Sequence, residues 1–118
     1  MRNFDELYDR VIRFRDDRDW KQFHHPKDLA ISIALEAAEL LEHFQWKGRE
    51  EVARDLEDPE RQQAIGEEMA DVLILLLSAS DAVGVDLYEA TLLKIEKNAA
   101  KYPVEKAKGN ALKYDRLE

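Results

Sequence analysis

Apolar residues recur three and four positions apart along most of this chain, the spacing that places them on one face of an α-helix. The first such segment covers about 3–19, and Asn3 begins a capping-box pattern at its start. A second segment runs from Pro26, which suits the first turn of a helix, to Trp46, and Gly48 is expected to end it. The pattern therefore predicts two helices in the first half of the chain.

The second half continues in the same way. Residues 50–56 fit one or two helical turns, and a long apolar pattern over 59–83 is followed by Gly84 as a stop. A last helix is expected over about 86–101, because Pro103 prevents its continuation. No segment alternates as a β-strand would, and no internal repeat is evident. Four helices with short connections predict an all-α, four-helix-bundle-like fold.

The length and composition agree with a single folded domain. The chain has 118 residues, of which 45% are hydrophobic and 37% charged, a profile typical of a helix-rich globular protein. We expect one domain over 1–103 and a polar tail over 104–118, in which Tyr114 and Leu117 are candidate anchors.

Charge and residue usage exclude several classes of function. The net charge of −8 and the lack of a basic stripe argue against binding to a nucleic acid polymer. With no cysteine, the chain has neither disulfides nor thiolate chemistry. The first ten residues contain no apolar stretch typical of a signal peptide, and the apolar run 72–77 is too short to span a membrane. We therefore expect a soluble cytoplasmic protein that binds no membrane.

Two pairs of carboxylates interrupt the most apolar segments. Glu36 and Glu39 are three residues apart in the second predicted helix, and Glu68 and Asp71 have the same spacing in the third. Residues at this spacing share a helix face, and both helices are apolar on nearly all other sides, as expected of buried helices. Buried carboxylates repel one another and are costly unless a cation compensates them.

Two interpretations of these acids stay open on the residues alone. They form salt bridges or a solvated stripe, or they bind a metal ion. Oxygen ligands without cysteine suit Mg²⁺, with Mn²⁺ as the other candidate. A di-iron centre requires Glu-x-x-His on two helices, whereas His43 lies four residues after Glu39 and the third helix has no histidine. A magnesium cluster would suit a polyphosphate substrate, because the ions neutralise phosphate oxygens.

Several stretches of the sequence resemble one known family. "EAAELLEHFQW" followed by "EEMADVLILLL" resembles the MazG-like, all-α nucleoside triphosphate pyrophosphohydrolases, whose signature is E-x-x-E, a spacer and E-x-x-D. "RDWKQFHHPKDLAISIALEAAELLEHFQWK" and "KIEKNAAKYP" resemble their dCTP pyrophosphatase branch, and the resemblance covers about residues 10–103. It implies a MazG-like catalytic domain over 1–103 that hydrolyses nucleoside triphosphates between the α- and β-phosphates. It also implies Mg²⁺ dependence, a house-cleaning role on dCTP-like pyrimidine nucleotides, and a homotetramer built as a dimer of dimers.

The resemblance also assigns roles to individual residues. It implies that the metal is bound by the two acidic pairs, Glu36, Glu39, Glu68 and Asp71. It implies that the base and sugar pocket is lined by Trp20, His24 and Trp46, and that the phosphates are met by Lys94, Asn98 and Tyr102. The residue types suit these roles, since tryptophan offers a flat stacking face and Lys94 and Asn98 share a helix face.

The chain departs from the family pattern at two positions. Some branches carry a general-base glutamate directly before the first metal glutamate, where this chain has Leu35. We therefore interpret Glu36 or Glu39 as the residue that assists a metal-activated water. Leu75 stands where close relatives often carry tyrosine, which leaves substrate choice open. The alternative from another class is a non-catalytic helical scaffold whose acids form structural salt bridges across an oligomer.

Overall fold

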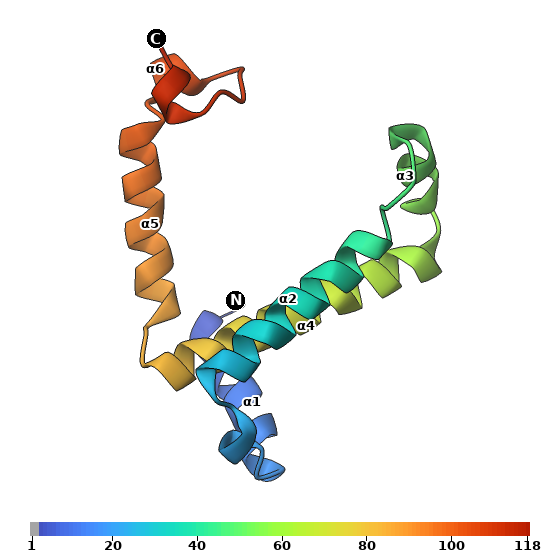
Figure 1. Ribbon diagram of the computed structural model, residues 1–118, viewed down its shortest axis with the longest axis vertical. Coiled ribbons are helices and arrows are strands. Elements are labelled where there is room, and N and C mark those ends of the chain that lie inside the picture. Colours follow the sequence, from blue (N-terminus) through green and yellow to red (C-terminus); the bar gives the residue numbers. More distant parts are fainter. Residues whose placement is uncertain (1–2) are drawn as a thin grey trace. The chain divides into compact units, whose positions relative to one another are not determined.

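The computed structural model describes residues 3–118, and within this range every regular element is a helix. The elements are α1 (Phe4–Asp17), α2 (Pro26–Glu42), α3 (Arg49–Asp55), α4 (Pro59–Val83), α5 (Leu87–Lys101) and α6 (Val104–Ala107), with 3₁₀ turns at Lys21–Phe23 and Tyr114–Arg116 (Figure 1). The predicted all-α class is confirmed. Among the helices of the described residues, none is both long and apolar enough to cross a membrane.

The chain divides into two compact units, one ending at Gly84 and the other running from Val85 to Glu118. In the first unit, α2 and α4 lie side by side and run in opposite directions, and α1 packs against α4 (Figure 1). The predicted single domain over 1–103 spans the boundary between the units and stays a prediction.

The core of the first unit is small. Its fully or nearly buried apolar residues come from α1, α2 and α4, and they are Val11, Leu29, Ile65 and Leu77. Many other large apolar side chains on α2 and α4 remain half-exposed in the single chain. The helix pair thus has more apolar surface than its own unit covers.

Side-chain caps fix the predicted helix starts. The Asn3 side-chain oxygen accepts a hydrogen bond from the backbone N–H of Asp5 at 2.7 Å. Asp58 caps α4 in the same way, directly before Pro59, and Asp86 caps α5. These contacts satisfy backbone donors that have no partner inside the helix. The helix starts were therefore readable from the sequence.

The second helix is shorter than expected. It ends at Glu42, not near Trp46, because the next residues turn more tightly and the N–H groups of Phe44 and Gln45 both bond the carbonyl of Leu41 at 2.9 Å. Trp46 itself adopts a left-handed backbone conformation, with φ of +67°. An apolar pattern cannot report this change of backbone, because Phe44 and Trp46 continue it beyond the helix.

The second unit contains α5, α6 and the tail. α5 ends at Lys101, as Pro103 predicted. The tail then folds back, and the Tyr114 ring packs edge-on against the Tyr102 ring with centroids 6.2 Å apart. Lys101 also lies over the Tyr114 ring. The expectation that Tyr114 anchors the tail is confirmed.

Candidate functional site

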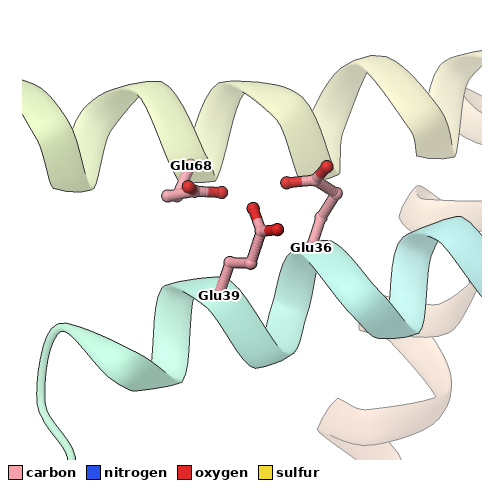
Figure 2. A group of neighbouring side chains, drawn as sticks. All are labelled: Glu36, Glu39 and Glu68. Carbon is pink, nitrogen blue, oxygen red and sulfur yellow. The ribbon is translucent and has the colours of Figure 1, made fainter.

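Three glutamates meet at the interface of α2 and α4. Glu36 and Glu39 project from successive turns of α2, and Glu68 faces them from α4 (Figure 2). Each offers a carboxylate oxygen, and these oxygens all lie within 4.8 Å of one another. The i,i+3 spacing within α2 and the antiparallel pairing with α4 together produce this arrangement.

The proximity of the carboxylates changes their acidity. The pKa of Glu36 is raised, chiefly by hydrogen bonding with Glu68, and further by burial and by the charges of Glu68 and Asp71. The pKa of Glu39 is raised chiefly by hydrogen bonding with Glu36 and by the charge of that residue. Adjacent carboxylates favour a shared proton because two negative charges this close repel each other.

The three glutamates fit a divalent cation. One oxygen of Glu36 and one of Glu68 are buried without a hydrogen-bond partner. Within residues 3–118, the ion pairs of arginine and lysine involve other carboxylates, namely those of Asp16, Asp55, Asp58 and Asp81. Unpaired oxygen ligands from several acids are what Mg²⁺ or Mn²⁺ binds in proteins. The intrachain geometry therefore favours the metal interpretation over salt bridges.

Two further acidic positions lie beside the group. Asp71, one turn after Glu68 on α4, is exposed and does not belong to the group of three, although its charge acts on Glu36. Glu42 is exposed at the last turn of α2. The structure thus brings together three of the four predicted metal ligands and leaves Asp71 at the edge.

The residues predicted to contact the base lie at opposite ends of the helix pair. Trp20 and His24 precede α2, whereas Trp46 follows it, and the acids occupy its middle. From Pro26 to Glu36 the helix rises about 15 Å. Trp20 and His24 therefore do not share a pocket wall with Trp46 in a single chain.

Trp46 is exposed and its backbone is constrained. Its side chain is 92% exposed, so it is not a core anchor of this unit. The following residue, Lys47, pairs with Asp55 of α3 at 2.5 Å, and Arg61 of α4 reaches the same carboxylate at 3.3 Å. These pairs fix the loop that carries Trp46. A bulky residue in the left-handed region is uncommon, and such strain is more frequent at functional sites.

The predicted phosphate contacts belong to the second unit. Lys94 and Asn98 are exposed and line one shallow groove along α5, as their i,i+4 spacing predicted. Tyr102 is half-buried against Tyr114 at the end of α5. The acids and these three residues lie in different units, so a shared role in one site stays a prediction.

A polar cluster around the buried Arg15, close to His24, was not predicted from the sequence. Arg15, on the buried face of α1, is only 4% exposed and pairs with Asp81 of α4. A weak signal was present, because Arg15 is four residues after Val11 and so lies on the apolar stripe of α1. Its partner is 66 residues away, and no local spacing identifies it.

Comparisons with known proteins give matches over most of the chain. A family model described as the MazG-like family matches residues 31–117. The chain is 40% identical over 104 residues to dCTP pyrophosphatase 1 of Bos taurus and 38% identical to that of Homo sapiens, covering 88% of this chain in both cases. It spans less than two thirds of these relatives, 62% and 61% of their lengths.

A solved structure has a similar fold. A pyrophosphatase from Archaeoglobus fulgidus superimposes with a TM-score of 0.78 at 45% sequence identity, covering 87% of this chain and 94% of that one. The family match begins within α2 and includes both acidic pairs, so it starts later and ends later than the region of about 10–103 that the motifs suggested.

Proposed function

This chain belongs to the MazG-like family, and on that premise we propose that it hydrolyses nucleoside triphosphates between the α- and β-phosphates. The products are a nucleoside monophosphate and pyrophosphate. Similarity to proteins named dCTP pyrophosphatase 1 supports dCTP-like pyrimidine nucleotides as substrates and a house-cleaning role in the nucleotide pool. The observation that carries the proposal is the group formed by Glu36, Glu39 and Glu68, with its two unpartnered buried oxygens.

The acids would hold Mg²⁺, with Mn²⁺ as the other candidate. Glu36, Glu39 and Glu68 provide the nearest oxygens, and Asp71 would complete the set from the edge. When bound, the ion supplies positive charge that neutralises phosphate oxygens and polarises the group under attack. Glu36 or Glu39 would assist by accepting a proton from the attacking water.

The remaining predicted residues would bind the nucleotide. Trp20 and Trp46 offer aromatic faces for the base, and His24 offers a ring nitrogen. Lys94, Asn98 and Tyr102 would contact the phosphates, in keeping with their donor groups. Because Trp20 and Trp46 lie at opposite ends of α2, one nucleotide meets both only where a second copy supplies one of them.

Self-association therefore forms part of the proposal. Half-exposed apolar side chains on α2 and α4, such as Leu35 and Met69, form surface that a single chain leaves uncovered. A symmetric assembly buries such surface on both partners. We propose a homotetramer arranged as a dimer of dimers, in which neighbouring chains complete each base pocket.

A nucleotide panel tests the proposed activity. The purified protein with Mg²⁺ should release pyrophosphate and nucleoside monophosphate from at least one pyrimidine deoxynucleotide, and chelation of the metal should stop the reaction. Release of orthophosphate, or no turnover of any nucleotide, would refute the proposal.

A matched pair of variants then tests the site. Glu39→Gln should lower kcat at least about 100-fold, because it removes both a ligand and a base. Glu42→Gln is the control, since it makes the same chemical change one turn later on α2, outside the group of three. Equal activity in the two variants would contradict the assignment of Glu39.

A further inference from the structure

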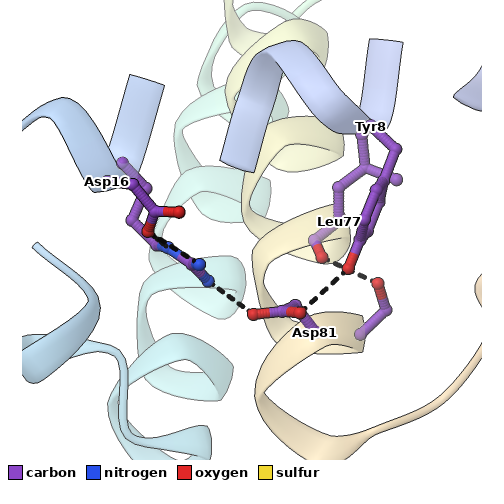
Figure 3. Close-up of polar contacts among 6 residues, drawn as sticks. Tyr8, Asp16, Leu77 and Asp81 are labelled. Atoms are coloured by element: carbon purple, nitrogen blue, oxygen red, sulfur yellow. Dashed lines mark hydrogen bonds and ion pairs between the residues drawn. The ribbon is translucent and has the colours of Figure 1, made fainter. Parts of the chain in front are cut away.

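An ion pair joins α1 to α4, in which the Arg15 side chain is buried and that of Asp81 is 31% exposed. The Arg15 guanidinium donates to the Asp81 carboxylate at 2.6 Å, and the other Asp81 oxygen accepts from the Tyr8 hydroxyl at 3.0 Å (Figure 3). Arg15 also donates to Asp16 at 2.9 Å. Both oxygens of Asp81 thus have partners, and Arg15 holds the pKa of that carboxyl below its ordinary value. Because the guanidinium of Arg15 is buried, loss of the Asp81 carboxylate leaves its charge less well compensated.

The same arginine fixes the chain that follows α1. The backbone carbonyl of Arg15 accepts hydrogen bonds from the N–H groups of Arg18 at 3.2 Å and of Trp20 at 3.1 Å. The Trp20 ring packs edge-on against Phe14, with centroids 5.8 Å apart, and the Arg18 guanidinium covers Phe14 at 3.7 Å. The side chain of Arg15 is therefore held to α4 while its carbonyl holds the turn that carries Trp20.

His24 lies at the other end of this short connection. Its Nδ1 is buried and has no hydrogen-bond partner among the described residues. Burial lowers the pKa of His24 and the positive charge of Arg15 lowers it further, while the charge of Asp81 acts in the opposite direction. The imidazole is thus close to the ion pair, its neutral form is favoured, and Nδ1 is still able to form a hydrogen bond.

We propose that Arg15 and Asp81 are positioning residues for nucleobase binding: their ion pair holds the segment from Trp20 to His24 against α4 in its binding orientation. This inference rests on the proposed function and adds to it residues that contact neither phosphate nor metal. Asp81 lies ten residues beyond Asp71 on α4, which corresponds to about 15 Å along the helix. The pair thus acts on binding of the base and leaves the reacting phosphates unaffected.

The test separates base binding from phosphate binding. Asp81→Asn keeps the shape of the side chain and removes its charge, and Arg15 retains Asp16 as a partner. KM for dCTP should rise about tenfold, within the range expected from partial loss of stacking, while kcat changes less than about twofold. Inorganic tripolyphosphate carries the phosphates without the base, so its inhibition constant should be unchanged. A variant that is merely less well folded would weaken both ligands.

Two further variants complete the design. Tyr8→Phe removes only the second hydrogen bond to Asp81, so it should raise KM for dCTP in the same direction by about two- to threefold, even if Asp81→Asn fails to fold. Asp17→Asn removes an exposed carboxylate from the same helix and should leave KM unchanged. An unchanged KM in Asp81→Asn or Tyr8→Phe, or a parallel loss of tripolyphosphate binding, would overturn the inference.

Activity of the wild type tests the proposed function separately from the positioning role. If the wild type hydrolyses dCTP and these variants leave KM unchanged, only the positioning role is refuted. If the wild type neither hydrolyses nor binds any nucleotide in a calorimetric titration, the proposed function fails, and the positioning role fails with it.

Discussion

The pKa of Glu36 is raised chiefly by Glu68 on another helix, whereas that of Glu39 is raised chiefly by Glu36 on its own helix. On α2 alone they are two acids one turn apart, and Glu68 on α4 brings a third carboxylate within 4.8 Å. The sequence predicted these acids because their spacing is local and their surroundings are apolar. It did not predict Arg15 with Asp81, because a contact across 66 residues depends on how α1 is rotated against α4.

The raised pKa values predict how stability depends on pH. In the folded state the pKa values of Glu36 and Glu39 lie above the ordinary value of 4.5, so their stabilising effect is complete below that pH. It is lost as the pH rises through the raised pKa values, because both groups then ionise beside other charges. The metal-free protein should therefore melt at a higher temperature in Glu39→Gln than in the wild type at pH 8.

The same pair of melting temperatures, measured at pH 5, provides the control. The advantage of Glu39→Gln should shrink there, since the wild-type group is again partly protonated. Other titrating groups, including His24, are present in both proteins and cancel in the difference. Added Mg²⁺ should raise the melting temperature of the wild type more than that of the variant. A melting difference that is independent of pH and of Mg²⁺ would argue against a coupled acidic site.

Substitutions of Trp46 by alanine and by glycine separate its contribution to nucleotide binding from the strain of its backbone. Because its side chain is 92% exposed, Trp46→Ala should change the free energy of unfolding by less than about 0.5 kcal/mol. Its KM for nucleotide should rise with kcat nearly constant, since stacking is worth about 1–3 kcal/mol per base. Trp46→Gly should have a similar KM but be up to about 1 kcal/mol more stable than Trp46→Ala, because glycine tolerates the left-handed backbone.

Melting curves and kinetics on both variants check these expectations. A large loss of stability in Trp46→Ala would identify the side chain as a packing residue of the assembly and not as a base contact. Equal stability of the alanine and glycine variants would show that the left-handed backbone of the loop carries no strain.

The helices were predictable as elements because their signals are local. Apolar spacing, proline at the first turn and capping side chains gave α1, α4 and α5 within about two residues, the usual uncertainty of helix ends. The end of α2 was misplaced, since Trp46 continues the apolar pattern although its backbone has left the helix. Tyr114 was predicted to anchor the tail, but its partner Tyr102 was not, because no local spacing relates the two rings.

Two glycines, one inside α4 and one directly after it, provide a test of helix stability. Gly84 ends the helix with φ of +74°, a conformation that costs other residues about 1–2 kcal/mol, so Gly84→Ala should destabilise by about 1 kcal/mol. Gly66 lies inside the same helix with free space around the position of an added Cβ. Gly66→Ala should therefore stabilise by up to about 1 kcal/mol.

Chemical denaturation of both variants measures these free energies. The opposite signs are the informative result, since the same substitution is made twice on one helix. A stabilising Gly84→Ala would mean that the left-handed end of α4 is not required in solution.

For the whole molecule, the sequence predicted that the second and third helices are apolar on nearly all sides, and in the single chain many of these side chains on α2 and α4 are exposed. Which copy covers which face depends on an interface that no periodicity encodes. Leu35 is 61% exposed in the single chain, where Leu35→Lys should change stability by less than about 0.5 kcal/mol. If an assembly covers this face, the same change buries an unpaired charge at the interface, and the assembly should dissociate.

Sedimentation and kinetics on the same samples therefore distinguish a single chain from an assembly that covers Leu35. The wild type should sediment as an oligomer at micromolar concentration, and Leu35→Lys should sediment as a smaller species with a raised KM for nucleotide. The rise in KM follows because Trp20 and Trp46 lie at opposite ends of α2, so that a dissociated chain retains only one wall of the pocket. Gln62→Lys adds the same charge at an exposed polar position of α4 and should alter neither property. A wild-type monomer with full activity would show that one chain forms the whole site, in conflict with the placement of Trp20 and Trp46.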